Sequence, residues 1–360
     1  MVQQPTYDRF SAKQLTFSGT EVYKDVYQEL MMLHLLSNLH QTVCDSAGLE
    51  YQTHAFPRLL CTRLVHGPIP SYFIIRQFKD DLEATNSSAE QQIKKMYHFE
   101  ETCLGLPREH LVTVMKFGGD ALFGGLFTKK GDTPEDKQRQ PHLQPQQLLS
   151  LCLQTTLALA VVEAVYQFEH RDLHLCNILV KATKKALVRF KLRSRIYTVP
   201  SFGVKAIIID VTFSRLALGF PGQQQQQQQQ VFSSDLSSRL KCIEPSAEAP
   251  DRQEVAYKSM YQLVGDGGWE EWHPETNLIW LRYLLEEVLS ARVFGHGKAN
   301  SFLCLEGTRT KPILKGILAL VQRMIGKSGH QQKQRSTVSK LVEKILEKLP
   351  NSGLAVEDHD

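Results

Sequence analysis

The seven cysteines of this 360-residue chain are widely scattered, odd in number and without any CxxC pair. Their spacing argues against both a zinc ribbon and a disulfide framework. The chain also lacks an excess of either charge: its net charge of +4 is too small to identify a nucleic-acid binder. No apolar run approaches the length of a membrane span, and the polar start does not resemble a signal peptide. We therefore expect a cytosolic or nuclear protein that binds neither a membrane nor nucleic acid directly.

The residues that are present predict an α+β fold. Apolar residues at helical spacing predict a helix over 20–39, and two strand-like segments follow at 71–78 and 110–117. The segment 147–168 is apolar nearly all round, which is typical of a buried helix. Three β-rich pieces then occupy residues 177–213. The pattern predicts a small mixed part, a buried helix and a β-rich middle.

Three segments are expected to be irregular. Residues 129–146 are polar and rich in Pro and Gln, which is typical of a surface insertion. Residues 223–230 are eight consecutive glutamines, which predict a disordered loop because they bury nothing apolar. Residues 350–360 are expected to form a flexible tail. Between these last two segments, residues 269–349 predict a helical end to the fold.

The segment EHRDLHLCNILV, residues 169–180, carries the chemistry on which the functional interpretation depends. Three interpretations are open: a phosphoryl-transfer loop, a metal site on His170 and His174, or an ordinary polar turn. A zincin-type metal site needs a Glu directly after the first His, where this chain has Arg171. No obvious third ligand follows, so the metal interpretation is disfavoured.

The sequence matches the requirements of a phosphoryl-transfer loop at more positions. A kinase catalytic loop needs a carboxylate that orients the substrate hydroxyl and accepts its proton, and five residues later an amide oxygen that holds a metal ion. Asp172 and Asn177 have this spacing. A second metal-binding Asp must end a strand, and Asp210 closes the strand-like AIIID after an interval that leaves room for one hairpin. A chance HRD in a surface turn would not supply all three residues.

With these residues in place, the chain resembles the haspin group of atypical eukaryotic protein kinases. FEHRDLHLCNILVK is similar to the catalytic loop of that family, and IIIDVTFSRL is similar to its metal-binding segment, with Val211 at the position of an aromatic residue. WEEWHPETNLIWLRYL is similar to the family's C-terminal-lobe signature. The resemblance extends across roughly residues 10–325.

The resemblance implies a protein-kinase-like bilobal α+β fold. The reduced N-terminal lobe would span residues 1–117, and a mainly helical C-terminal lobe would span 118–349. The implied cofactors are ATP and Mg²⁺, with Asn177 and Asp210 as metal ligands. Asp172 would orient the substrate hydroxyl.

Four further residues receive roles from the same resemblance. His170 and Arg171 complete the catalytic set, and Arg171 would brace the loop rather than touch the substrate. Glu29 matches the αC glutamate that pairs with a phosphate-binding lysine. Lys13 is the candidate for that lysine.

The adenine of ATP would bind at the hinge between the lobes. The resemblance implies that Met115, Lys116 and Phe117 are the gatekeeper and hinge, with Gly118 and Gly119 just after them. The adenine would then form hydrogen bonds with backbone groups and lie between apolar walls.

Besides Val211, two departures from the family pattern leave the function open. No GxGxxG precedes Glu29, so either the sequence is part of a longer chain or the protein lacks its phosphate lid. The family's acidic αF position falls on Ser259. One hypothesis is a serine/threonine kinase, for which the resemblance implies a histone-tail substrate and a nuclear or chromosomal location. The other is a pseudokinase or interaction scaffold.

Overall fold

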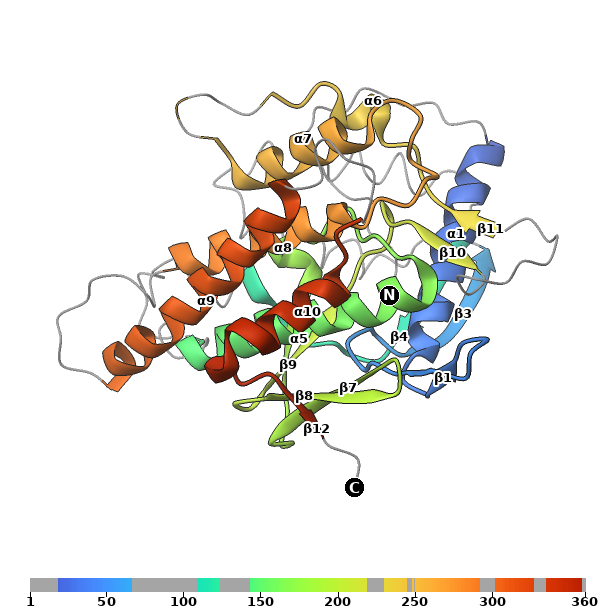
Figure 1. Cartoon of the computed structure of the whole chain (residues 1–360). Helices are drawn as coiled ribbons and strands as arrows, with labels where there is room; N and C mark the ends of the chain where they lie inside the picture. Colours follow the sequence, from blue (N-terminus) through green and yellow to red (C-terminus); the bar gives the residue numbers. More distant parts are fainter. Residues whose placement is uncertain are drawn as a thin grey trace, which may run out of the picture. The chain divides into compact units, whose positions relative to one another are not determined.

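The computed structural model describes most of the chain, and its helices and strands form an α+β structure (Figure 1). The described residues are 19–66, 109–123, 143–218, 230–244, 248, 250–291, 302–326 and 335–357. Contacts among Cα atoms divide the chain into two units, and the smaller one ends at Lys116. Residues 16–58 belong to the larger unit, whereas the sequence-based division grouped them with the rest of 1–117.

The described part of the smaller unit is one antiparallel pair of strands. β3 (Leu59–His66) pairs with β4 (Glu109–Met115), so the strand predicted at 110–117 is confirmed. The strand predicted at 71–78 lies outside the described residues.

The larger unit contains the helices that the structure describes. They are α1 (Gly19–Asn38), α5 (Pro145–Tyr166), α6 (Ser237–Leu240), α7 (Arg252–Val264), α8 (Glu275–Ser290), α9 (Phe302–Gly326) and α10 (Val338–Lys348), with 3-10 turns η1 (Leu175–Asn177) and η3 (Pro350–Ser352). The predicted helix over 20–39 and the helical end are confirmed. Helix α5 begins inside the segment 129–146 that was expected to be an insertion, and Leu143 before it is already buried.

The remaining strands form small antiparallel sheets. They are β1 (Val43–Cys44), β2 (Glu50–Tyr51), β5 (Asp120–Ala121), β6 (Ile178–Ala182), β7 (Leu187–Leu192), β8 (Arg195–Pro200), β9 (Val204–Ile208), β10 (Leu216–Leu218), β11 (Gln230–Phe232) and β12 (Ala355–Glu357). The three-stranded sheets have the orders β5-β6-β9 and β12-β8-β7. Gln230, expected in the disordered loop, pairs with Leu218, while 223–229 lie outside the described residues.

The expectation of a flexible tail over 350–360 is wrong for its first eight residues. After η3, strand β12 pairs with β8, with Val356 opposite Tyr197. The side chain of Leu354 is buried just before this strand. The backbone pairing and the buried leucine together fix this segment to the larger unit.

Helix α5 is the central element of the larger unit (Figure 1). It forms because its interior holds no glycine or proline: its proline is Pro145 at the first turn, where no backbone N–H is needed. The backbone N–H of Gln144 donates to Gln147 Oε1 (2.8 Å) at the start, and Gln167 ends the helix in the left-handed conformation. Contrary to expectation, α5 is long and apolar enough to cross a membrane, but 94% of its most apolar window is buried inside the protein. It is therefore a core helix here.

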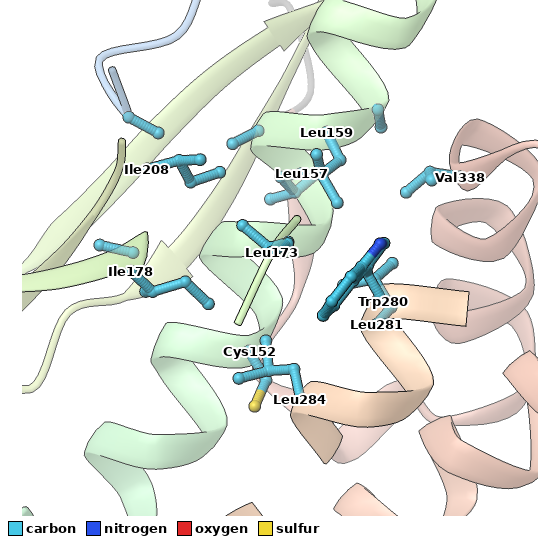
Figure 2. Close-up of a cluster of buried hydrophobic side chains, with 14 of the residues drawn as sticks. Cys152, Leu157, Leu159, Leu173, Ile178, Ile208, Trp280, Leu281, Leu284 and Val338 are labelled. Atoms are coloured by element: carbon cyan, nitrogen blue, oxygen red, sulfur yellow. The ribbon is translucent and has the colours of Figure 1, made fainter. Parts of the chain in front are cut away.

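The core around α5 joins the sheet to the helical end, as Figure 2 shows. Leu157 and Leu159 of α5 lie between Ile208 of β9 and the helices that carry Trp280 and Val338. Each of these side chains is fully buried, and such burial stabilises a fold by roughly 1.5–3 kcal/mol per large apolar residue. Val165 and Phe168, at the end of α5 and just after it, are buried as well, so the loop that follows starts from a packed base.

Candidate active site

An antiparallel strand pair brings Asn177 and Asp210 to the same end of a sheet. Strand β6 begins directly after Asn177, and β9 ends two residues before Asp210. The pairing places Ile178 opposite Ile208, and the Ile209 N–H donates to the Asn177 carbonyl oxygen (2.9 Å). The one hairpin expected in the interval is β7–β8. Asn177 and Asp210, which are 33 positions apart in the sequence, are therefore close together in the fold.

Asp172 lies in the loop 169–177 and is held from two directions. Its carbonyl oxygen accepts a hydrogen bond from Asn177 Nδ2 (2.8 Å), which also lies 3.5 Å from Asp172 Oδ2. Its Oδ1 accepts a hydrogen bond from the hydroxyl of Tyr257. The Asp172 side chain is 13% exposed, so the carboxylate is shielded but reachable. Such a carboxylate can orient a hydroxyl and accept its proton.

Asp210 adopts a left-handed backbone conformation (φ 62°) directly beyond β9. Its Oδ1 accepts hydrogen bonds from the N–H (3.2 Å) and the hydroxyl (2.7 Å) of Thr212. Val211, at the position where the family has an aromatic residue, is buried. The turn therefore orients the carboxylate of Asp210 while the next side chain fills the core.

The side chains of Asn177 and Asp210 offer oxygen atoms, the type of ligand that a magnesium ion prefers. Mg²⁺ prefers oxygen ligands and is usually bound by one or two protein groups together with substrate phosphates. Because Asn177 Nδ2 is committed to Asp172, the amide oxygen is the atom left for a metal. Among the described residues, no group of three or more His, Cys, Asp or Glu side chains could hold a metal ion. The donor set suits a shared ion better than a closed protein cage.

His170 is a buried, neutral link between the loop and β9. Its Nδ1 accepts a hydrogen bond from the Asp172 N–H (3.3 Å), so the proton lies on Nε2, which donates to the Ile209 carbonyl oxygen (3.1 Å). Burial lowers the pKa of His170 to about 4, although the charge of Asp210 opposes this. With both ring nitrogens engaged, His170 does not form a metal site with His174.

Arg171 braces the loop from the inside. It is fully buried in a left-handed conformation (φ 63°), and its Nε donates to Glu169 Oε2 (3.1 Å). Its two terminal nitrogens donate to Ser233 Oγ (2.9 Å) and to the Trp269 carbonyl oxygen (2.8 Å). The guanidinium carbon also lies 5.2 Å from the centroid of the Trp269 ring. A buried charge with this many partners has a structural role, because leaving it unpaired would be strongly destabilising.

The sequence interpretation missed Asn277, which holds the backbone of the loop. Its Oδ1 accepts a hydrogen bond from the His170 N–H (3.1 Å), and its Nδ2 donates to the Phe168 carbonyl oxygen (2.8 Å). The family's acidic αF position, which holds the loop in kinases, was assigned from the sequence to Ser259, but here the side chain that holds the loop backbone is Asn277 on α8. Ser259 Oγ instead donates to the Val255 carbonyl oxygen (2.7 Å) on its own helix. The signal was available, since Asn277 lies inside the quoted signature WEEWHPETNLIWLRYL.

The sequence interpretation also missed Tyr257, whose hydroxyl donates a hydrogen bond to the Asp172 carboxylate. Burial and the charge of Asp172 raise the pKa of Tyr257 well above its usual range. Its hydroxyl is therefore protonated and acts as the donor. No local pattern singles it out, because it lies 85 residues from Asp172 on α7.

The predicted hinge residues fall at the junction of the two units. Met115 ends β4, and Lys116 is the last residue of the smaller unit. Phe117 is the first residue of the larger unit, with 72% of its surface exposed. Gly118 and Gly119 follow, and Gly119 has a φ of 114° that favours glycine.

The two residues expected to position the phosphates differ in what the structure describes. Glu29 lies on α1 in the larger unit and is partly buried. Lys13 lies outside the described residues. Their pairing stays a prediction.

A loop in which an Asp follows His-Arg, an Asn five residues later and an Asp at the end of a neighbouring strand is typical of protein kinases. The comparison with protein families agrees. The chain belongs to the family described as "Haspin like kinase domain", whose sequence model matches residues 137–344, more than half of the chain. This family implies a kinase-like fold, consistent with the α+β structure.

Curated relatives carry the same family name. The chain is 34% identical over 175 residues to a serine/threonine-protein kinase haspin homolog of Drosophila melanogaster, covering 49% of this chain and 28% of the relative. It is 34% identical over 145 residues to serine/threonine-protein kinase haspin of Mus musculus, covering 40% and 18%. It is 27% identical over 274 residues to the Bos taurus protein of that name, covering 76% and 30%. The chain thus matches less than a third of each relative's length.

Proposed function

We propose that this chain is a haspin-type serine/threonine protein kinase, which transfers the γ-phosphate of ATP to a Ser or Thr hydroxyl of a protein. The observation that carries the proposal is the joint placement of Asp172, Asn177 and Asp210. Asn177 bonds to Asp172 through its side chain and to the residue before Asp210 through its backbone. The names of the relatives support the same activity.

In the proposed fold, the smaller unit is a reduced N-terminal lobe and the larger unit is the C-terminal lobe. The hinge residues 115–119 would then bind the adenine, and Lys13 with Glu29 would position the phosphates. These assignments rest on the family resemblance and on the boundary after Lys116.

Asp172 would orient the substrate hydroxyl and accept its proton. The Tyr257 hydroxyl and Asn177 Nδ2 hold the carboxylate, while His170 holds the backbone N–H of Asp172. Asn177 and Asp210 would hold Mg²⁺, which neutralises charge on the phosphates when it is bound. Most of the catalytic effect of this chain would come from positioning, because phosphoryl transfer needs little covalent chemistry from the protein.

We also propose a basic histone tail as the protein substrate and the nucleus or chromosomes as the location. Both follow from the resemblance to haspins. The exposed Asp251 at the start of α7 and the partly buried Glu254 offer negative charge on the helix that carries Tyr257.

The test is transfer of labelled γ-phosphate from Mg-ATP to a basic, threonine-containing histone-tail peptide. We expect the wild-type chain to transfer phosphate and Asp172→Ala to lose about 10²–10⁴-fold in rate, as removal of a general base does. Asp266→Ala is the matched control, because Asp266 is exposed and bonds only to groups outside the site. A wild-type chain that folds and binds Mg-ATP but transfers nothing would instead favour an interaction scaffold.

A further inference from the structure

The Tyr257 hydroxyl forms a direct hydrogen bond with the Asp172 carboxylate. It donates to Asp172 Oδ1, whereas Asn177 Nδ2 lies 3.5 Å from Oδ2 and His174 Nε2 lies 3.8 Å from Oδ1. We propose that Tyr257 is a positioning residue for phosphoryl transfer, which fixes the orientation of the Asp172 carboxylate. This inference rests on the proposed kinase function and deepens it.

Aromatic packing and a hydrogen bond from its own helix hold the Tyr257 hydroxyl in place. Its ring packs edge-to-face against Trp280, with centroids 5.1 Å apart and planes at 81°. Trp280 is fully buried, and it packs in the same manner against Tyr283, with centroids 5.5 Å apart. On its own helix, Gln253 Nε2 lies 3.4 Å from the Tyr257 hydroxyl and donates to it. The aromatic cluster therefore sets the location of the donor, and the donor sets the location of Oδ1.

The orientation of Asp172 matters because its terminal torsion is soft. Rotation about the bond to a carboxyl group is broad and roughly two-fold, so packing alone does not select one orientation. A hydrogen bond to a charged acceptor is about twice as strong as a neutral one, and it acts here on one named oxygen. In reactions that depend on positioning, a misplacement of 1 Å can cost on the order of 10²-fold in rate. The contact thus has the geometry and the strength to influence turnover.

The kinetic test compares Tyr257→Phe with wild type, using Mg-ATP and the histone-tail peptide. Tyr257→Phe keeps the ring and its packing on Trp280 but removes the hydroxyl. We expect kcat to fall by about tenfold or more, while the KM values for ATP and for peptide stay within about twofold, since the residue acts through Asp172. A kcat equal to that of wild type would overturn the proposal.

The matched control is Tyr261→Phe, one turn further along α7. Tyr261 also donates its hydroxyl to a carboxylate, Asp266 Oδ1 (2.8 Å), but this pair is exposed. We expect Tyr261→Phe to keep the wild-type kcat. An equal loss of kcat in both variants would show a general effect on α7 and would also overturn the proposal.

A crystal structure of Tyr257→Phe gives a readout that does not depend on activity. We expect the Asp172 carboxylate to rotate by tens of degrees relative to a wild-type crystal structure, with the aromatic cluster unmoved. An Asp172 carboxylate in the same orientation in both would refute the positioning role, even if phosphate transfer were absent. If the wild type also transfers no phosphate, but the carboxylate is rotated in Tyr257→Phe, the proposed function is contradicted. The role of Tyr257 in orienting Asp172 is then still supported.

Discussion

Replacing Asn277 with alanine should destabilise the larger unit and loosen the 169–177 loop. The side chain is fully buried and bonds to three groups that belong to α5 or to the loop region after it. It accepts from the His170 N–H (3.1 Å), and it donates to the Phe168 carbonyl oxygen (2.8 Å) and to Glu163 Oε2 (3.2 Å). Asn277→Ala removes all three hydrogen bonds at once and creates no new partner.

The expected cost follows from the two backbone groups left without a partner. Phe168 and His170 are both fully buried, so water cannot replace the amide. An unsatisfied buried donor or acceptor costs about 1–3 kcal/mol, so the pair gives about 2–6 kcal/mol. Since a domain is stable by only about 5–15 kcal/mol, this is a large fraction of the total.

Urea unfolding at pH 7 measures the effect. For a loss of this size, we expect the midpoint to move down by on the order of 1 M. The control is Asn38→Ala on α1, where the exposed amide bonds to His34 and the change should stay within about 0.5 kcal/mol. If Asn277→Ala unfolds at the same urea concentration as Asn38→Ala, the assigned role of this amide is refuted.

Two further predictions concern buried groups in the larger unit. Burial raises the pKa of Glu163 from 4.5 to about 8. Between these pH values the folded protein holds a proton that the unfolded chain has released. The free energy of unfolding should therefore fall by roughly 1 kcal/mol per pH unit as the pH rises through this range. In Glu163→Gln, the free energy of unfolding measured at pH 5, 7 and 9 should depend less on pH than in the wild type. An unchanged pH dependence would contradict the raised pKa of Glu163. Gly119→Ala should cost more than about 1 kcal/mol, because the new Cβ would meet the backbone of Val180 at a φ of 114°. Thermal unfolding should show a smaller loss for the control Gly48→Ala, which has φ 76° but open space around it.

The parts of the site that could be predicted from the sequence are those defined by local spacing. Asp172 and Asn177 are five positions apart, and β6, which follows Asn177, pairs with β9, which precedes Asp210, in a simple antiparallel ladder. Asp210 could be placed because it ends an apolar strand. Residues that are close in sequence, or joined by short connections, have few alternative arrangements in the fold, so their proximity can be predicted.

The supports of the site could not be predicted in the same way. Tyr257 reaches the loop across 85 residues, and no local pattern marks it. Asn277 reaches it across 107 residues and lies inside the family signature, but the signature alone does not say which group it binds. Ser259 was assigned on the family pattern, but the loop is held by an amide on the next helix, α8. The prediction of a flexible tail over 350–360 was wrong for a similar reason, because β12 forms by pairing with β8, a strand far away in the sequence.

The hydrogen bonds that complete the site also determine when it can form during synthesis. The loop precedes its supports in the chain, because Asn277 and Tyr257 are translated after it. Glu163, which bonds to Asn277, gains its second partner from the Val338 N–H (2.9 Å), 175 residues further on. Contacts of such long range form late in folding, since the loop-closure entropy must be met first. A nascent chain that ends before α8 therefore carries the candidate catalytic residues without the Asn277 hydrogen bonds that hold their loop, and Glu163 keeps only its bond to Asn277 until α10 is made.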